Sequence, residues 1–251
     1  MAGDAAASIA CRGLHVVRSG RAILRSVDLE ARSGEVLGVL GPSGAGKSTL
    51  FRALVGESLP DAGTVLLGGR DVTRWPLWRR ARAGVGYVPQ SPSVLWDLTV
   101  GQNLESFRAI AGLPSADARV AAARVGLQDR LDVQAGRLSA GERRRLEVAR
   151  AVTRTLQVLV CDEPFSGVDP AGAERLGELL REVAAGGAAV MLADHHVAEA
   201  LRICTHAVLL LDGSVAASAP AGEFADHPLV RGRYLGTWHR SLAPPPSGRE
   251  P

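Results

Sequence analysis

The stretch Gly41-Pro42-Ser43-Gly44-Ala45-Gly46-Lys47-Ser48 decides the fold, because its glycine spacing suits a tight loop between a strand and a helix. An apolar run at 36–40 precedes it, and a helical pattern at 48–55 follows, with Gly56 placed to end the helix. Glycines let backbone N–H groups curl around phosphate, and a helix start adds unpaired N–H groups and a positive dipole end. The pattern therefore predicts a phosphate-binding loop of the Walker A type.

Two side chains of this loop carry chemistry of their own. Lys47 supplies a positive charge suited to the β- and γ-phosphates of a nucleotide, and Ser48 supplies a hydroxyl suited to Mg²⁺. A glycine-rich turn without a ligand is the alternative, but the flanking strand and helix favour nucleotide binding. The residues that we predict to contact the nucleotide here are Gly41, Pro42, Ser43, Gly44, Ala45, Gly46, Lys47, Ser48 and Thr49.

The composition of the 251-residue chain fits a folded protein. Hydrophobic residues make up 46%, enough for one large α/β domain or two small ones. The net charge is +3, and an arginine-rich solvated surface explains it better than nucleic-acid binding, although basic groups also suit an anionic membrane surface. We therefore predict no nucleic-acid partner.

Cysteine usage and hydropathy bear on the compartment. Cys11, Cys161 and Cys204 form no C-x-x-C pair, so we expect buried thiols in a reducing compartment rather than disulfides or a zinc site. The first ten residues do not resemble a signal peptide, and no apolar run reaches the about 20 residues that cross a bilayer. On its own the chain is expected to be soluble or peripheral to a membrane.

Apolar runs predict an α/β fold with a parallel-sheet core, an antiparallel β ribbon and an inserted helical subdomain. Residues 9–17 and 27–31 are predicted as strands of the ribbon. Unbroken apolar runs suit parallel strands that are covered on both faces, and they lie at 84–88, 158–161, 188–193 and 207–211.

The domain limits follow from composition and helical periodicity. A helical pattern between residues 99 and 133 predicts an inserted subdomain that spans about 91–155. The main domain is predicted to cover 1–240, and the tail at 241–251, rich in Pro and Ser, is expected to be disordered.

A basic segment from Arg70 to Arg82 carries two tryptophans, Trp75 and Trp78. Arginine stems and indole rings both cover apolar surface, so the segment predicts an amphipathic surface helix with its aromatic rings turned inward. A binding patch is the alternative.

A second chemical pattern is the apolar strand Val158-Leu159-Val160-Cys161 followed by Asp162 and Glu163. Acidic groups at the carboxyl end of such a strand lie where doubly wound sheets bind ligands, which is the Walker B arrangement. We predict that Asp162 holds Mg²⁺ and that Glu163 accepts a proton from attacking water. Two solvated acids at a strand end are the alternative, which the phosphate loop disfavours.

The third pattern is Leu138-Ser139-Ala140-Gly141-Glu142. Ser139 and Glu142 form a capping box that begins a helix. The same exposed N–H groups, next to the small Gly141, suit a second anion, so that one phosphate would lie between two helix starts. A simple helix cap is the alternative.

Together these motifs resemble the ABC family. Leu138 to Glu142 is similar to the family signature Leu-Ser-Gly-Gly-Gln, and Gln90 matches the Q-loop. Ser166-Gly167-Val168-Asp169 matches the D-loop, and His195 matches the switch histidine. The motifs occur in the family order across roughly residues 9–238, so the sequence is identified as a member of the superfamily.

The resemblance implies an assembly. In this family two cassettes pack head to tail around two ATP molecules, so the phosphate loop of one copy would face Ser139 and Gly141 of the other. Gln90 would meet Mg²⁺ and signal its presence to a partner, and His195, rather than the neighbouring His196, would contact the γ-phosphate.

The resemblance also implies a function: an ATP hydrolase that works as a homodimer or paired cassette. It would energise transmembrane permease subunits from the cytoplasmic face of the inner membrane. The closer resemblance is to the branch of lipopolysaccharide-export ATPases, through Asp194-His195-His196-Val197 among others. Branched-chain amino-acid importers share the ending Tyr234-Leu235-Gly236, and a regulatory cassette that moves no solute is a third alternative. The substrate and its direction stay open.

The sequence departs from the family pattern at three positions. Arg18 stands where an aromatic residue usually stacks on adenine, a role that a guanidinium can also fill. Ala140 replaces a signature glycine, and His196 replaces an asparagine of the export branch.

A last stretch, 91–98, is expected to line the groove for a membrane partner. Its apolar residues either form the wall of that groove or pack inside the helical subdomain, and they are Val94, Leu95, Trp96 and Leu98.

Overall fold

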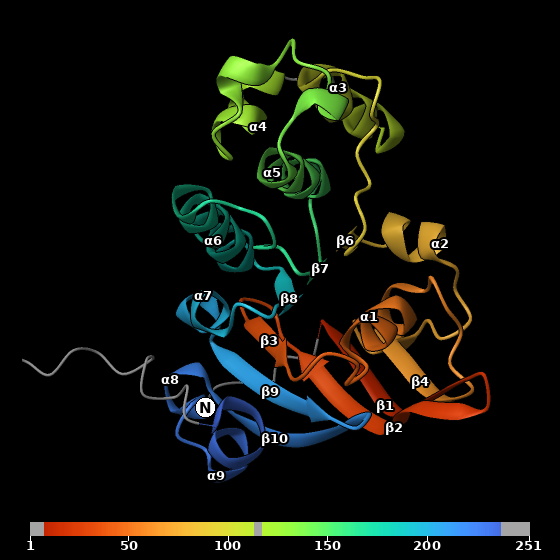
Figure 1. Cartoon of the computed structure of the whole chain (residues 1–251). Helices are drawn as coiled ribbons and strands as arrows, with labels where there is room; N and C mark the ends of the chain where they lie inside the picture. The colour runs from red at the N-terminus through yellow and green to blue at the C-terminus, as the bar shows by residue number, and fades with distance from the viewer. Residues whose placement is uncertain (1–7, 113–116, 237–251) are drawn as a thin grey trace, which may run out of the picture.

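The computed structural model describes residues 8–112 and 117–236, which form two sheets and the helices around them (Figure 1). The larger sheet has the order β10-β9-β3-β8-β7-β6, in which all neighbours are parallel except β10 and β9. The smaller sheet, β2-β1-β4-β5, is antiparallel. The predicted parallel core and antiparallel ribbon are therefore confirmed.

The strands of both sheets follow the predicted runs, but β2 is longer than the expected 27–31. Its first half mixes polar and apolar side chains, and pairing with β1 extends the strand to the turn before Arg21. The strands are β1 (Ile9–Arg18), β2 (Arg21–Ala31), β3 (Val36–Leu40), β4 (Ala62–Leu67), β5 (Arg70–Asp71), β6 (Val85–Val88), β7 (Val158–Asp162), β8 (Ala189–Ala193), β9 (His206–Leu211) and β10 (Ser214–Pro220).

The larger sheet separates two apolar cores. Along β7, Val158 and Val160 pack with residues of α1, whereas Leu159 and Cys161 pack with residues of α5, α6 and α7. Every residue of β3, β7 and β8 is buried, as expected for parallel strands with helices on both faces. The helices are α1 (Lys47–Val55), α2 (Leu77–Arg82), α3 (Val100–Ile110), α4 (Ala118–Ala123), α5 (Ala140–Ala151), α6 (Pro170–Ala185), α7 (Val197–Ile203), α8 (Ala221–Phe224) and α9 (Pro228–Val230), with single turns η1 (Gln128–Arg130), η2 (Ala135–Arg137) and η3 (Arg231–Leu235).

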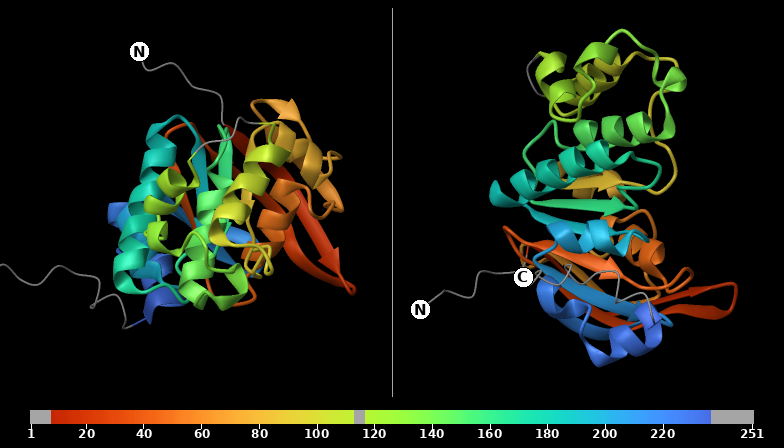
Figure 2. Two further views of the ribbon diagram at one scale, coloured as in Figure 1. Left: turned by 90° about the horizontal axis from the view of Figure 1, so that it is seen from above. Right: turned by 60° about the vertical axis from the view of Figure 1, so that its left-hand side comes forward.

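The helices between β6 and β7 form one end of the molecule. In Figure 1 and in the right-hand view of Figure 2, α3 and α4 lie at the end opposite the antiparallel sheet, with α5 between them and α6. Leu104, Val125 and Leu127 are fully buried in this part. The subdomain limits at about 91–155 and the domain limits at 1–240 stay predictions, and the tail at 241–251 lies outside the described residues.

The cysteines are free thiols, buried at Cys11 and Cys161 and half-buried at Cys204. Burial raises the pKa of each to about 12, so they are unreactive as thiolates at neutral pH. Among the described residues, we find no helix with the combined length and hydropathy that crossing a bilayer requires.

The prediction of a helix over Arg70–Arg82 is wrong in two respects: the helix is shorter, and one of the two tryptophan rings is not turned inward. The chain forms β5, turns, and becomes helical only in α2, because Pro76 disfavours a helical conformation for the residue before it. Trp75 is half-buried beneath the guanidinium groups of Arg70 and Arg79, at 4.6 and 4.0 Å from its ring centre. Trp78 points outward instead, with 60% of its surface exposed.

A buried arginine on α2 was not predicted. The Arg80 guanidinium donates to the carbonyl oxygens of Ala53 (2.8 Å) and Leu54 (2.6 Å), which lie at the end of α1. It also donates to Trp75 O (3.0 Å) and Thr73 O (2.8 Å). Burial lowers the pKa of Arg80 to about 10, which leaves it charged at neutral pH. Arg80 therefore fixes the far end of the helix that begins at the phosphate loop.

Arg80→Met is expected to lower the free energy of unfolding by about 3 kcal/mol, because the carbonyl groups that it serves would lose a charged donor. Arg82→Met is the matched control: Arg82 lies exposed on the same helix over the Trp78 ring, and its loss should cost less than about 0.5 kcal/mol. Urea unfolding measures both. Equal destabilisation by the two substitutions would contradict the role given to Arg80.

Candidate active site

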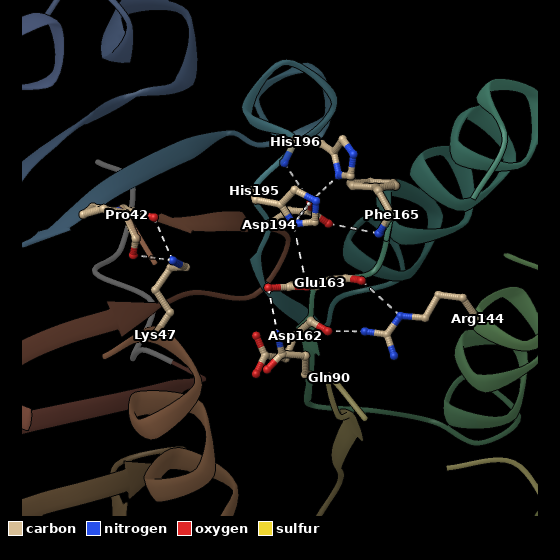
Figure 3. A network of polar contacts seen from close by, with 11 residues as sticks. Pro42, Lys47, Gln90, Arg144, Asp162, Glu163, Phe165, Asp194, His195 and His196 are labelled. Atoms are coloured by element: carbon tan, nitrogen blue, oxygen red, sulfur yellow. Dashed lines mark hydrogen bonds and ion pairs between the residues drawn. The ribbon is translucent and has the colours of Figure 1, made fainter. Parts of the chain in front are cut away.

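Most of the predicted site residues, though not Arg18, Ser139 and Gly141, lie at the carboxyl ends of four neighbouring strands. The phosphate loop follows β3, Gln90 follows β6, Glu163 follows β7 and His195 follows β8. Parallel strands place these ends along one edge of the sheet, where open α/β folds bind ligands. Figure 3 shows Lys47 on one side of the site and Asp162, Glu163 and His195 on the other.

The phosphate loop is shaped by glycines that no other residue replaces without strain. Gly46 is the residue before α1 and has a φ of 108°, and a β-carbon on it would lie 2.9 Å from Leu24 Cδ2. A β-carbon on Gly41 would lie 2.2 Å from Leu210 O. Pro42, Ser43 and Gly44 are exposed at the loop surface, and Gly41, Ala45 and Gly46 are buried beneath it.

Lys47 lies across its own loop. Its ammonium group donates to Gly41 O (2.7 Å) and Pro42 O (2.9 Å). Burial lowers the pKa of Lys47, and the negative charges of nearby carboxylates oppose this shift. The carboxylates that act on it are Glu163, Asp162 and Asp194. A cation held in this way suits a bound polyphosphate.

Asp162 is a buried acid at the end of β7. Only 1% of its surface is exposed, and its Oδ2 atom has no hydrogen-bond partner among the described residues. Burial raises the pKa of Asp162, whereas a hydrogen bond from the Ser48 hydroxyl lowers it. A buried carboxylate oxygen without a donor, next to a hydroxyl, fits an oxygen-preferring cation.

Glu163 is held in an unusual backbone conformation, with a φ of 59°. Its N–H donates to Ala193 O (2.7 Å), which anchors it to β8. Its Oε1 atom accepts a hydrogen bond from Gln90 Nε2 (3.0 Å), and its Oε2 atom lies 3.6 Å from His195 Nδ1. The left-handed conformation, which is costly for a glutamate, thus aims the carboxylate into the site between two polar partners.

Asp194 orients the segments after β7 and β8, and it was missed as a site residue. It is fully buried, and its Oδ2 atom accepts from the Phe165 N–H (3.0 Å). Its Oδ1 atom accepts from the His196 N–H (2.8 Å) and contacts His196 Nδ1 at 2.9 Å. The His196 ring is thereby held by Asp194, and His195 Nδ1 lies 3.6 Å from Glu163 Oε2 and 3.7 Å from Asp194 Oδ1. The available signal was an Asp three residues before a helix, where an Asp side chain commonly accepts a hydrogen bond from the backbone N–H two residues further on.

The signature segment forms the predicted capping box. The Glu142 N–H donates to Ser139 Oγ (3.2 Å), and the Ser139 N–H donates to Glu142 Oε2 (2.8 Å). A β-carbon on Gly141 would lie 2.6 Å from Gly167 O, so only glycine permits this packing against the 166–169 segment. Among the described residues, no hydrogen bond joins Ser139 or Gly141 to residues 41–49 of the same chain.

Two other predicted features are Arg18 and the stretch 91–98. Arg18 ends β1 and is exposed, with its guanidinium 3.6 Å from the Asp61 carboxylate. In the 91–98 stretch Val94 is buried, whereas Leu95 and Trp96 are 38% and 48% exposed. Val94 therefore packs inside the helical region and Leu95 and Trp96 lie at its surface, while the groove for a membrane partner stays a prediction.

The fold and the site define a nucleotide-binding protein of the P-loop class. The family model described as ABC transporter matches residues 24–166, more than half of the chain. The chain belongs to the ABC transporter family and is an ATP-binding, ATP-hydrolysing subunit of that family.

Relatives with curated names cover most of the chain. The lipopolysaccharide export system ATP-binding protein LptB of Acidithiobacillus ferridurans is 39% identical over 222 residues, which are 86% of this chain and 91% of that protein. LptB of Escherichia coli K12 is 34% identical over 235 residues, with 92% and 98% covered. An uncharacterised ABC transporter ATP-binding protein of Rhizobium meliloti is 38% identical over 238 residues, with 91% and 86% covered.

Solved structures share the fold. An ATP-binding subunit of an ABC transporter superposes with a TM-score of 0.78 at 25% identity and covers 93% of this chain and 98% of its own. A dimeric ATP-binding cassette bound to ADP and phosphate has a TM-score of 0.77 at 22% identity, with 85% and 98% covered.

The raised pKa of Asp162 gives a pH dependence of stability with a defined sign. The folded state holds the Asp162 proton more tightly than the unfolded state, so the stability from this group falls as pH rises from the ordinary value of 3.8 through the raised one. Asp162→Asn is therefore expected to raise the thermal midpoint of the nucleotide-free protein at neutral pH. It should also flatten the pH dependence of unfolding in that window.

Thermal unfolding in a metal chelator, between about pH 4 and pH 8, measures this effect. The control is Asp97→Asn, which changes an exposed aspartate on the protein surface. A neutral-pH midpoint for Asp162→Asn at or below that of the unmodified protein would show that the burial of this carboxylate is not destabilising.

Proposed function

We propose that this chain powers the export of lipopolysaccharide or a related lipid, working with separate transmembrane permease subunits at the cytoplasmic face of the inner membrane. The observation that carries the proposal is the 39% identity to LptB over 222 residues, with coverage of nearly the whole of both chains. Membership of the ABC transporter family alone would not identify the transported substrate. Two LptB proteins from different organisms stand among the named relatives, which supports the export branch.

Within this proposal the phosphate loop binds the triphosphate, and Glu163 accepts the proton of the attacking water. Gln90 and His195 approach the two oxygens of that carboxylate, which holds it ready in one orientation. His195, at the end of β8, would also contact the γ-phosphate. Lys47 would exchange its bonds to the loop carbonyls for bonds to phosphate oxygens.

Ser48, Gln90 and Asp162 are the residues that would hold Mg²⁺. The Oδ2 atom of Asp162, which has no partner among the described residues, supports this assignment, because burial of a carboxylate oxygen without a donor is costly unless a cation compensates. When bound, Mg²⁺ supplies positive charge that neutralises the phosphate oxygens.

The active unit is a pair of cassettes, a homodimer in the simplest case. The box at the start of α5 leaves Ser139 exposed and unconnected to the phosphate loop of its own chain, which supports a role toward a second copy. A solved cassette of the same fold is dimeric with ADP and phosphate bound. Ser139 and Gly141 would then complete the phosphate site of the partner copy.

Glu163→Gln is expected to reduce ATP turnover at least about 100-fold while ATP still binds, because the amide cannot accept the proton. With turnover blocked, ATP and Mg²⁺ should accumulate the paired form, seen by size-exclusion chromatography with light scattering. Glu178→Gln, an exposed change on α6, should turn over ATP normally. Near-normal hydrolysis by the Glu163 variant would remove it as the proton acceptor, and a monomer under all nucleotide conditions would remove the pair.

The export assignment is tested through the membrane partner. Tagged Glu163→Gln protein, purified from membranes with ATP present, should carry permease subunits with it. After reconstitution in liposomes with unmodified cassette, lipopolysaccharide should stimulate ATP turnover several-fold, whereas leucine or valine should not. Stimulation by the amino acids, or capture of a cell-wall regulator in place of a permease, would reject lipid export.

A further inference from the structure

Three charged side chains lie buried along one side of α5. Arg144, Glu147 and Arg150 are 5%, 4% and 3% exposed, and their spacing of three residues places them on one face of the helix. Burying a charge is costly unless it is paired and fully hydrogen-bonded. Their partners therefore show what the helix holds in place.

The partners of Arg144 are backbone groups of the active site. Its guanidinium donates to Pro89 O (2.6 Å), the residue before Gln90, and to Glu163 O (3.1 Å). It also donates to Asp162 O, as Figure 3 shows. One side chain thus fixes the end of β6 against the end of β7.

Glu147 and Arg150 extend this network away from the site. Glu147 accepts from Arg144 (2.9 Å) and, at its other oxygen, from the Ser93 N–H. Arg150 donates to Ser93 O (2.8 Å) and to Asn103 Oδ1 (3.1 Å).

Asn103 completes the connection to the surface. It is fully buried, its Oδ1 atom accepts from the Leu95 N–H (2.9 Å), and its amide group donates to Leu95 O (3.0 Å). Continuous hydrogen bonds therefore run from the backbone of Glu163 to the loop that exposes Leu95 and Trp96.

We propose that Arg144 is a positioning residue for ATP hydrolysis. By holding the carbonyl groups of Pro89, Asp162 and Glu163, it sets the 3.0 Å contact between the Gln90 amide and the Glu163 carboxylate. Through Glu147 and Arg150 it joins that contact to the surface loop at 93–98. The inference rests on the roles proposed above for Gln90 and Glu163.

Arg154 provides a matched control within the same chain. It is less buried than Arg144 but likewise donates to backbone carbonyls, Ala81 O (2.6 Å) and Val85 O (2.7 Å), at the opposite end of β6. Replacement by lysine keeps the charge and removes the forked donor geometry in both cases. The two variants therefore differ in place rather than in chemistry.

Arg144→Lys is expected to lower kcat at least tenfold, while the affinity for a fluorescent ATP analogue stays within twofold. Arg154→Lys should lower the thermal midpoint without a comparable loss of kcat. A purely structural role for Arg144 predicts that the two variants lose stability and activity in the same proportion. That result would overturn the proposal.

A double-mutant cycle tests whether Arg144 acts through Gln90. In a Gln90→Ala background, Arg144→Lys should lower kcat less than threefold further, because the contact that it positions is already gone. Glu147→Gln, a milder change, should lower kcat two- to fivefold in the unmodified protein and not in the Gln90→Ala background. The Glu147→Gln variant provides the test if the Arg144→Lys variant does not fold.

The outcomes separate this inference from the proposed function. Near-normal turnover by Gln90→Ala alone would refute the role proposed for Gln90. A second outcome would refute the positioning role alone. In it, Gln90→Ala reduces turnover, and Arg144→Lys or Glu147→Gln lowers kcat by the same factor in the Gln90→Ala background as in the unmodified protein.

Discussion

The structure depends on a concentration of negative charge at the carboxyl ends of β7 and β8. Asp162 and Asp194 are buried, Glu163 lies between them in sequence and space, and all three act on the pKa of Lys47. Like charges this close repel, and burial denies them water. Backbone N–H groups stabilise Asp194, but Asp162 keeps an oxygen without a partner. A bound cation would therefore compensate the negative charge that the fold leaves without a partner at Asp162.

The phosphate loop supplies positive charge opposite these carboxylates. Lys47 places a positive charge across the site from the acids, and α1 holds the loop in place. Gly46 allows the helix to begin at the loop, and Arg80 secures the final carbonyl groups of the same helix. A rigid helix anchored at both ends can hold a loop whose glycines would otherwise be flexible.

The sequence was sufficient for features written in local patterns. The phosphate loop, the acidic end of β7 and the capping box at Ser139 each lie within a short window, where residue type and spacing are decisive. The roles of Arg80 and Arg144 could not be predicted, because their partners are distant in sequence. Leu54 lies 26 residues from Arg80, and Pro89 lies 55 residues from Arg144. The burial of the two arginine side chains therefore becomes evident only in the folded structure. The helix expected over Arg70–Arg82 is shorter than predicted because Pro76 disfavours a helical conformation for the residue before it, so α2 begins only at Leu77.

The helix α5 rigidly connects the signature segment at Ser139 to the backbone of the active site. The helix begins after the exposed Ser139, and five residues beyond Ser139 the Arg144 guanidinium donates to the backbone carbonyl of Glu163. A displacement at either place must move the other, because a 12-residue helix with buried ionic contacts does not bend locally. If a second copy docks its nucleotide on Ser139, the same movement reaches Glu163, Gln90 and, through Glu147, the loop at 93–98. Pairing, hydrolysis and the surface that a permease would contact are then linked mechanically by a single element.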